Sequence, residues 1–304
     1  MNNGICWSDE AGEYIQAHGG SMLHYNNQWF WYGENKNTET VNRRVKFIGI
    51  SCYSSYDMKG WKYEGLVLKA SSNINDDLHE NCIAERPKVL FNRLTNKFVM
   101  WFHIDNREYT MASVGVAISD SAMGPFEYLG RQRPLGRDSR DMTVFQDTDG
   151  SAYLIHSSDW NSTLMIDRLN NEYTGLTGET ASICIDQYRE APVVMKQDNK
   201  YYMVTSGCTG WLPNSMLYAV SDHMMGRWKL IDNPCSGKDY RKTFGGQSAF
   251  AFCTNGQWML ALDHWNPQNL RVSGYSFLPV ELDKDYMSIA WQDEFQGLRS
   301  MPMN

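Results

Sequence analysis

The sequence predicts an all-β fold, a five-bladed β-propeller that forms one domain over residues 1–304. Three observations predict it: a strand hairpin recurs five times along the chain, a further strand follows each hairpin, and no linker, low-complexity tract or charge block separates the copies. Four-stranded sheets repeated radially are the blades of a propeller. A β-sandwich is the alternative, and the recurrence of a four-stranded unit favours the propeller.

Each hairpin consists of a short apolar run, a polar turn and an aromatic-rich strand. The turns carry pairs such as Asn-Asn, Asp-Gly, Asp-Asn and Asn-Gly, which favour tight connections between antiparallel strands. The apolar runs cover residues 21–24, 87–91, 142–145, 192–195 and 248–252. The aromatic strands with their turns cover residues 26–32, 96–102, 149–155, 198–204 and 255–261.

A second pair of strands is expected after each hairpin. In three copies an apolar strand leads through a short polar loop to a glycine and an aromatic residue: 47–53 before Gly60-Trp61, 114–119 before Gly124-Pro125-Phe126, and 217–221 before Gly226-Arg227-Trp228. The third copy has a shorter version at 163–168, and segments 270–279 and 289–292 are expected to complete the fifth blade.

Composition excludes several classes of protein. The formal net charge of −7, without any basic run, argues against a nucleic-acid partner, and no apolar run is long enough for a membrane span. The seven cysteines are dispersed and form no Cys-x-x-Cys pair, so neither a zinc site nor any other metal or cofactor is predicted. Free thiols in a reducing compartment favour a cytoplasmic location; a secreted protein without its signal peptide is the alternative.

The residues at the start of each innermost strand are the candidate site. In a propeller these strands line the central channel, and ligands bind at one mouth of it. The five blades place His18, Glu85, Asp141, Glu190 and Gln247 at this mouth, and His18 is expected to contact the substrate. Three carboxylates that converge without a balancing lysine repel one another, so some of their pKa values are expected to be raised.

These carboxylates suit the hydrolysis of a glycosidic bond. Glu190 is the candidate general acid that protonates the leaving-group oxygen, and Asp141 would orient Glu190 and keep its pKa high. Glu85 would accept hydrogen bonds from sugar hydroxyls. Structural alternatives remain for each: a turn amide as the partner of Glu190, Arg140 as the ion-pair partner of Asp141, and Arg86 as that of Glu85.

An inverting glycosidase also needs a base that activates water. Blade one offers His18 and no carboxylate, and blade five offers Gln247, whose amide carbonyl could position a water molecule. Trp211 could stack on a sugar ring. The further polar and aromatic residues expected to line the pocket are Glu34, Tyr109, Asn161, Thr209 and Trp211.

Several short strings together resemble the exo-β-1,3-galactanase subfamily of glycoside hydrolase family 43. They are Ala-His-Gly-Gly at 17–20, Trp-Tyr-Gly-Glu at 31–34, Ser-Arg-Asp-Met-Thr at 139–143, Arg-Glu-Ala-Pro at 189–192, Ser-Gly-Cys-Thr-Gly-Trp at 206–211 and Gly-Gln-Ser at 246–248. The resemblance covers residues 14–282. It implies a five-bladed propeller that hydrolyses glycosides by a single displacement with inversion.

The resemblance also implies roles for individual residues. The general acid falls on Glu190 and the pKa modulator on Asp141. The Asp base that most of the family carries on blade one is absent, and Gln247 stands where the subfamily has a glutamine thought to hold the nucleophilic water, as an amide or as its imidic tautomer. The residues that match galactose-binding positions are Glu34, Glu85, Tyr109, Asn161, Thr209 and Gln247.

The function expected from this match is release of galactose from the non-reducing end of β-1,3-galactan, the arabinogalactan backbone. The substrate partner is then a β-1,3-linked galacto-oligosaccharide or galactan. Alternatives are α-L-arabinofuranosidase or β-galactofuranosidase activity of the same family, and a sugar-binding propeller without catalysis. Members of the family often hold calcium in the central channel, but no run of ligands in this sequence predicts one.

Overall fold

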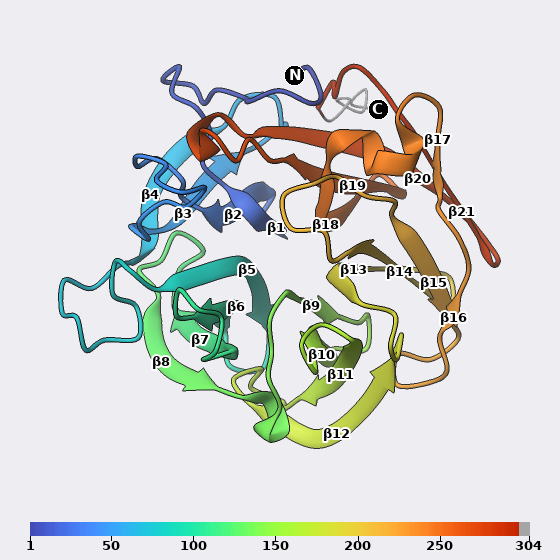
Figure 1. The fold of residues 1–304 in the computed structure, drawn as a ribbon, viewed down its shortest axis with the longest axis horizontal. Helices are drawn as coiled ribbons and strands as arrows, with labels where there is room; N and C mark the ends of the chain where they lie inside the picture. Colours follow the sequence, from blue (N-terminus) through green and yellow to red (C-terminus); the bar gives the residue numbers. More distant parts are fainter. Residues whose placement is uncertain (298–304) are drawn as a thin grey trace.

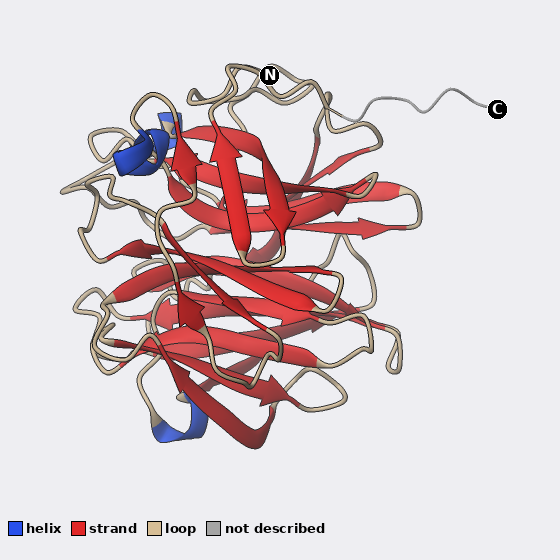
Figure 2. Cartoon of the chain, turned by 90° about the vertical axis from the view of Figure 1, so that its right-hand side faces the viewer, coloured by secondary structure: helices blue, strands red, loops and turns tan. Residues whose placement is uncertain are grey.

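The computed structural model describes residues 1–297 and confirms the all-β, five-bladed propeller. Five sheets follow one another around a common axis (Figure 1). Strands make up nearly all of the regular structure, as the side view in Figure 2 shows. The prediction of one domain over 1–304 includes residues 298–304, which lie outside the described residues.

Within each of the first four blades the strands pair antiparallel in chain order. Blade one contains β1 (His18–Tyr25), β2 (Gln28–Glu34), β3 (Gly49–Ser55) and β4 (Lys62–Lys69). Blade two contains β5 (Ile83–Asn92), β6 (Lys97–Asp105), β7 (Ser113–Ser119) and β8 (Glu127–Gln132). Blade three contains β9 (Met142–Gln146), β10 (Ala152–Ser158), β11 (Thr163–Leu169) and β12 (Leu176–Ile183). Blade four contains β13 (Arg189–Gln197), β14 (Lys200–Gly207), β15 (Leu217–Ser221) and β16 (Lys229–Leu230).

The fifth blade differs from the prediction in two places. It contains β18 (Gln247–Thr254), β19 (Gln257–His264), β20 (Gly274–Asp283) and β21 (Tyr286–Ala290), and also β17 (Cys235–Ser236), which pairs parallel with β21. A two-residue strand leaves no periodic pattern in a sequence, so β17 was not predicted. The strand expected from residue 270 begins at Gly274, because Leu270–Val272 form a 3₁₀ turn.

The N-terminal segment ties blade five to blade one. Ile5 forms an isolated antiparallel bridge with Tyr275 of β20, and the Gly4 amide donates to the Tyr275 carbonyl at 2.8 Å. Figure 1 shows this segment, in dark blue, running along the outer side of blade five. The ring is therefore closed by chain from both ends of the sequence.

An aromatic cluster fills the space between blades one and five. Trp31 of β2 is completely buried and lies edge-on to Trp61 and Tyr275, with ring centroids 5.3 and 4.8 Å apart. Trp7 packs edge-on against Phe277 at 4.9 Å. Such pairs add to the free energy gained by burying the rings. Five of the eleven tryptophans, namely Trp7, Trp29, Trp31, Trp61 and Trp101, are thus buried core residues.

Innermost strands β1, β5, β13 and β18 are bulged near their first residues. Pairing with the neighbouring strand shifts between His18 and Ser21, between Glu85 and Lys88, between Glu190 and Val193, and between Ser248 and Phe250. A bulge bends the strand and re-aims a side chain. In β5 and β13 the bend follows the glutamate directly, since Arg86 and Ala191 have left-handed φ angles of 54° and 52° and each precedes a proline.

Replacement of Trp31 tests the aromatic seam. Trp31→Ala is expected to lower the free energy of unfolding by about 3–5 kcal/mol, because it removes a large buried side chain and leaves a cavity. The control is Tyr56→Ala at a side chain that is 73% exposed, for which a change within about 0.5 kcal/mol is expected. Urea unfolding followed by fluorescence measures both; equal losses would contradict the assignment of Trp31 to the core.

Candidate active site

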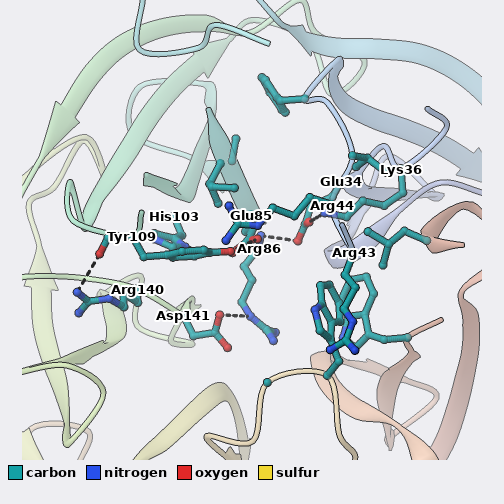
Figure 3. Close-up of a pocket in the computed structure, with 18 of the residues that line it drawn as sticks. Glu34, Lys36, Arg43, Arg44, Glu85, Arg86, His103, Tyr109, Arg140 and Asp141 are labelled. Atoms are coloured by element: carbon teal, nitrogen blue, oxygen red, sulfur yellow. Dashed lines mark hydrogen bonds and ion pairs between the residues drawn. The ribbon is translucent and has the colours of Figure 1, made fainter. Parts of the chain in front are cut away.

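A cavity of about 360 Å³ lies where the innermost strands begin (Figure 3). Its size is near the lower end for small-molecule sites, and it suits one or two sugar units. Eight of the ten predicted site residues line it: Glu34, Glu85, Tyr109, Asp141, Asn161, Glu190, Trp211 and Gln247. The structure therefore brings together residues from all five blades. The repeat positions predicted the residues of blades two to five, whereas blade one contributes Glu34 of β2 and not His18.

Glu190 has the environment of a proton donor. Burial and the negative charge of Asp141 raise the pKa of its carboxyl to about 8, and the nearby positive charge of Arg86 offsets only part of this rise. The Gln247 amide Nε2 donates to its Oε1 at 3.0 Å. A carboxyl that stays protonated at neutral pH and faces a cavity is suited to general acid catalysis.

Asp141 is held by two groups on either side of its carboxylate. One oxygen lies 2.8 Å from Nε of Arg86, and the other accepts the backbone N–H of Ala191 at 2.9 Å. The second bond fixes Asp141 directly beside Glu190. Arg140, the alternative partner, pairs with Asp138 instead.

Arg86 is the main site residue that sequence reasoning missed. Its guanidinium binds Asp141 through Nε, the Gln247 carbonyl oxygen through Nη2 at 2.9 Å and the Ser248 backbone carbonyl through Nη1 at 3.0 Å. The expectation that the acids converge without a balancing cation is therefore wrong, since Arg86 is buried among them. The sequence feature that could have indicated this role is the basic residue directly after Glu85, at the position of the bulge.

Gln247 is fully hydrogen-bonded. Its carbonyl oxygen accepts from Arg86 and from the Trp265 indole at 3.1 Å, and its NH₂ group donates to Glu190 and to the Ser206 hydroxyl at 3.1 Å. A primary amide has two donor hydrogens and two acceptor lone pairs, so all four positions are occupied. Arg86 and the Trp265 indole can only donate, so the carbonyl oxygen of the amide must face them and its NH₂ group must face Glu190 and Ser206.

Glu85 is, in contrast to Glu190, a stable anion. Burial acts to raise the pKa of its carboxyl, but His103, the positive charge of Lys36 and the Tyr109 hydroxyl together outweigh burial and lower the pKa to about 2. His103 lies 3.3 Å from one carboxylate oxygen, and the Tyr109 hydroxyl donates to the other at 3.1 Å. Glu85 is thus placed to accept hydrogen bonds from a ligand, and Arg86, its alternative ion-pair partner, binds Asp141.

Three other predicted residues complete the cavity wall. Glu34 is buried, pairs with Lys36 at 2.5 Å and accepts the backbone N–H of Arg86 at 3.0 Å. The side-chain oxygen of Asn161 is buried without a hydrogen-bond partner among the described residues, so it is free to bind a ligand hydroxyl. Trp211 lies edge-on to Trp265, with centroids 5.6 Å apart, and both line the cavity.

Two predicted site residues are corrected by the structure. His18 is completely buried: its imidazole lies 3.2 Å from Asp263 and stacks on Tyr275 at 4.7 Å, so it does not line the cavity. Thr209 is exposed, but its hydroxyl donates to the Leu212 carbonyl within its own loop and does not line the cavity. Position in the repeat predicted His18 and the family resemblance implied Thr209, but neither determines the direction of a side chain.

The structure offers no cluster of metal ligands within residues 1–297. No three His, Cys, Asp or Glu side chains in this range are arranged to hold a metal ion. In the same range, every helix is too short or too polar to cross a bilayer.

The chain matches the family model described as Glycosyl hydrolases family 43 over residues 18–277. It is similar to the solved structure of a family 43 β-1,3-galactosidase with galactodeoxynojirimycin: 36% identity over 97% of this chain and 99% of that chain, with a TM-score of 0.91. No curated protein sequence matches it.

Two longer proteins are similar as well. The exo-β-1,3-galactanase of Phanerochaete chrysosporium, solved with β-1,3-galactotriose, is 31% identical over 96% of this chain and 67% of its own, with a TM-score of 0.89. The exo-β-1,3-galactanase of Clostridium thermocellum is 33% identical over 96% of this chain and 65% of its own, with a TM-score of 0.87. This chain spans about two thirds of these two relatives.

Stability measurements test the raised pKa of Glu190. Between its ordinary value of 4.5 and about 8, the unfolded chain loses this proton and the native protein keeps it. The group therefore makes the protein less stable as pH rises through this window. Glu190→Gln removes the effect, so its melting temperature relative to the wild type is expected to rise by about 2 °C or more between pH 5 and pH 8. Glu172→Gln, at an exposed carboxyl outside the cavity, is the control, and a pH-independent difference for Glu190→Gln would contradict the assignment.

Proposed function

The chain belongs to glycosyl hydrolase family 43 and is a glycoside hydrolase, and we propose that it releases galactose from the non-reducing ends of β-1,3-galactan. The observation that carries this proposal is the Glu190 carboxyl, raised in pKa and bound to Gln247 beside the Asp141–Arg86 pair. Relatives over nearly the whole chain are β-1,3-galactosidases and exo-β-1,3-galactanases, two of them solved with a galactose-like inhibitor or galactotriose.

Glu190 is the general acid of the proposed reaction. It gives its proton to the glycosidic oxygen while the bond from that oxygen to C1 breaks, and a water molecule adds to C1 from the opposite face of the sugar. Burial and the negative charge of Asp141 keep Glu190 protonated. The added water loses a proton to solvent as it becomes the C1 hydroxyl, and the ionised Glu190 recovers a proton from solvent before the next turnover.

Gln247 holds the attacking water in this proposal. Because protein groups occupy all four of its hydrogen-bonding positions, substrate must displace one of them before the amide can bind water. In this proposal an entering sugar replaces the bonds to Glu190 and Ser206, because Arg86 is also held by Asp141 and by the Ser248 carbonyl. Arg86 and Trp265 would then keep the carbonyl in place while the NH₂ group exchanges partners.

The remaining residues of the cavity recognise the sugar. Ionised Glu85 accepts hydrogen bonds from hydroxyls, and the free oxygen of Asn161 accepts another. Trp211 and Trp265 present an aromatic wall on which a ring can stack. A closed set of such groups around one sugar favours exo-acting release from a chain end.

The sugar that the protein releases, and its anomeric form, test the proposed function. We expect the protein to release galactose from β-1,3-galactobiose, and proton NMR to show the α-anomer first, because single displacement inverts a β-linkage. An α-L-arabinofuranoside and a β-galactofuranoside serve as comparison substrates. Turnover of a furanoside alone would overturn the galactanase proposal, and first appearance of β-galactose would overturn inversion.

The role of Glu190 has its own pH and leaving-group test. The value of kcat/KM is expected to fall about tenfold per pH unit above pH 8, as Glu190 loses its proton. Glu190→Gln is expected to lower kcat by about 10²–10⁴-fold on galactobiose, since an amide cannot give a proton.

An aryl β-galactoside whose leaving group needs no protonation provides the control substrate. The Glu190→Gln variant is expected to lose much less activity on it. Equal losses on both substrates would show that Glu190 does not act as the acid.

A further inference from the structure

The entrance to the cavity is positively charged although the whole chain has a formal net charge of −7. Arg43, Arg44, Lys46 and Arg140 all line the cavity, and the Arg44 guanidinium donates to the backbone carbonyl of Arg107 at 2.8 Å. Arg43 and Arg44 lie on the side of the cavity occupied by Glu34 and Lys36, and Arg140 lies across from them (Figure 3).

The acids inside the cavity do not need these arginines for charge balance. Glu34 pairs with Lys36, Asp141 pairs with Arg86, and Glu85 is bound by the imidazole of His103, whose pKa is raised to about 9 by Asp105 and Glu85 despite burial. Each buried carboxylate that stays ionised thus has its own internal cation.

Two of the entrance cations are also neutralised. Lys46 pairs with Glu80 at 2.9 Å, and Arg140 pairs with Asp138. Within residues 1–297, Arg43, Arg44 and Arg107 have no carboxylate within ion-pair distance. Two of them, Arg43 and Arg44, line the cavity and therefore leave an excess of positive charge at one side of its entrance.

Arg43 is the most available of the three. The turn from Val41 to Arg44 is closed by two backbone hydrogen bonds of 2.8 and 3.1 Å, and its central residues Asn42 and Arg43 have left-handed φ angles of 52° and 62°. Such turns favour Asn followed by Gly, so an arginine at the second position is unusual. Its guanidinium makes no hydrogen bond or ion pair within the described part of the chain, whereas Arg44 is engaged with Arg107 and lies over the Tyr109 ring.

We propose that Arg43 forms a subsite for a carboxylate carried by the substrate, a uronic acid unit attached to the galactan beside the cleaved residue. The proposal rests on the proposed galactanase function and deepens it. A free guanidinium binds a carboxylate through two parallel hydrogen bonds, whereas neutral sugar hydroxyls need no such group. Arg44 and Arg107 add to the potential that attracts an anionic substrate to the entrance.

Two matched branched substrates test the subsite. Both are β-1,3-galacto-oligosaccharides with one β-1,6-linked unit on the residue next to the chain end: glucuronic acid in one and galactose in the other. We expect the wild type to favour the acidic substrate by about fivefold in kcat/KM, and Arg43→Ala to reduce this ratio to about one. Arg43→Lys should retain part of it, and added salt should lower it.

The control variant is Arg227→Ala, at an exposed arginine on blade four that does not line the cavity. It should keep the wild-type ratio. A structural defect in Arg43→Ala would lower kcat/KM for both substrates equally and leave the ratio unchanged, which would overturn the proposal. A stronger preference for a sulfated branch than for the uronate would overturn the assignment to a carboxylate.

Failure of the proposed function is distinguishable from failure of the subsite. If the wild type cleaves the neutral substrate and does not prefer the acidic one, galactanase function stands and the carboxylate subsite is wrong. If it cleaves neither substrate nor galactobiose, the galactanase proposal fails, and the subsite is then tested by calorimetric titration of the wild type with both oligosaccharides. Tighter binding of the acidic one that depends on Arg43 supports the subsite, and equal binding overturns it.

Discussion

The site depends on the interactions of the Arg86 guanidinium with groups of two other blades. It reaches from blade two to Asp141 at the start of blade three and to Gln247 and the Ser248 carbonyl in blade five. Without this cation Asp141 would lie beside Glu190 without its ion-pair partner, and repulsion between the two acids would favour their protonation or separation. Removing one partner of a buried ion pair typically costs about 3–5 kcal/mol, so Arg86 contributes to the joining of the blades as well as to the chemistry.

Three blades share the same bulge, but only blade two carries an arginine at this position. The residue after the first site residue is left-handed in three blades: φ is 57° at Gly19, 54° at Arg86 and 52° at Ala191. Each backbone N–H donates to a carboxylate of the preceding blade. Gly19 donates to Asp263 at 2.8 Å, Arg86 to Glu34 at 3.0 Å and Ala191 to Asp141 at 2.9 Å. A Cβ at Gly19 would lie 2.3 Å from Glu34, so blade one has no room for a side chain there. In blade two the side chain at this position, Arg86, extends to Asp141 and Gln247.

This arrangement accounts for how far the sequence could predict the structure. Hairpin turns and repeated strands are local patterns, so the five blades followed from them, as did the placement of Glu85, Asp141, Glu190 and Gln247 at one mouth. The partners of these residues were not predictable from local pattern, because Arg86, His103 and Trp265 reach the site through contacts between strands or between blades. His18 was assigned to the substrate because its repeat position is correct, yet Asp263 and Tyr275 hold its ring inside the protein.

Glu190 and Glu85 have different roles because their carboxyl groups have different neighbours. Glu190 and Glu85 occupy equivalent places in blades four and two, and each is followed by a residue with a left-handed φ angle and then by a proline. Glu190 is buried beside an anion, Asp141, and these two effects raise its pKa to about 8 although Arg86 and the Gln247 amide act to lower it. Glu85 meets a cation, because Asp105 at 3.0 Å keeps His103 protonated, and the pKa of Glu85 is lowered to about 2. One structural position therefore provides a general acid in blade four and an acceptor of hydroxyl hydrogen bonds in blade two. The groups that surround each glutamate determine which of these roles it has.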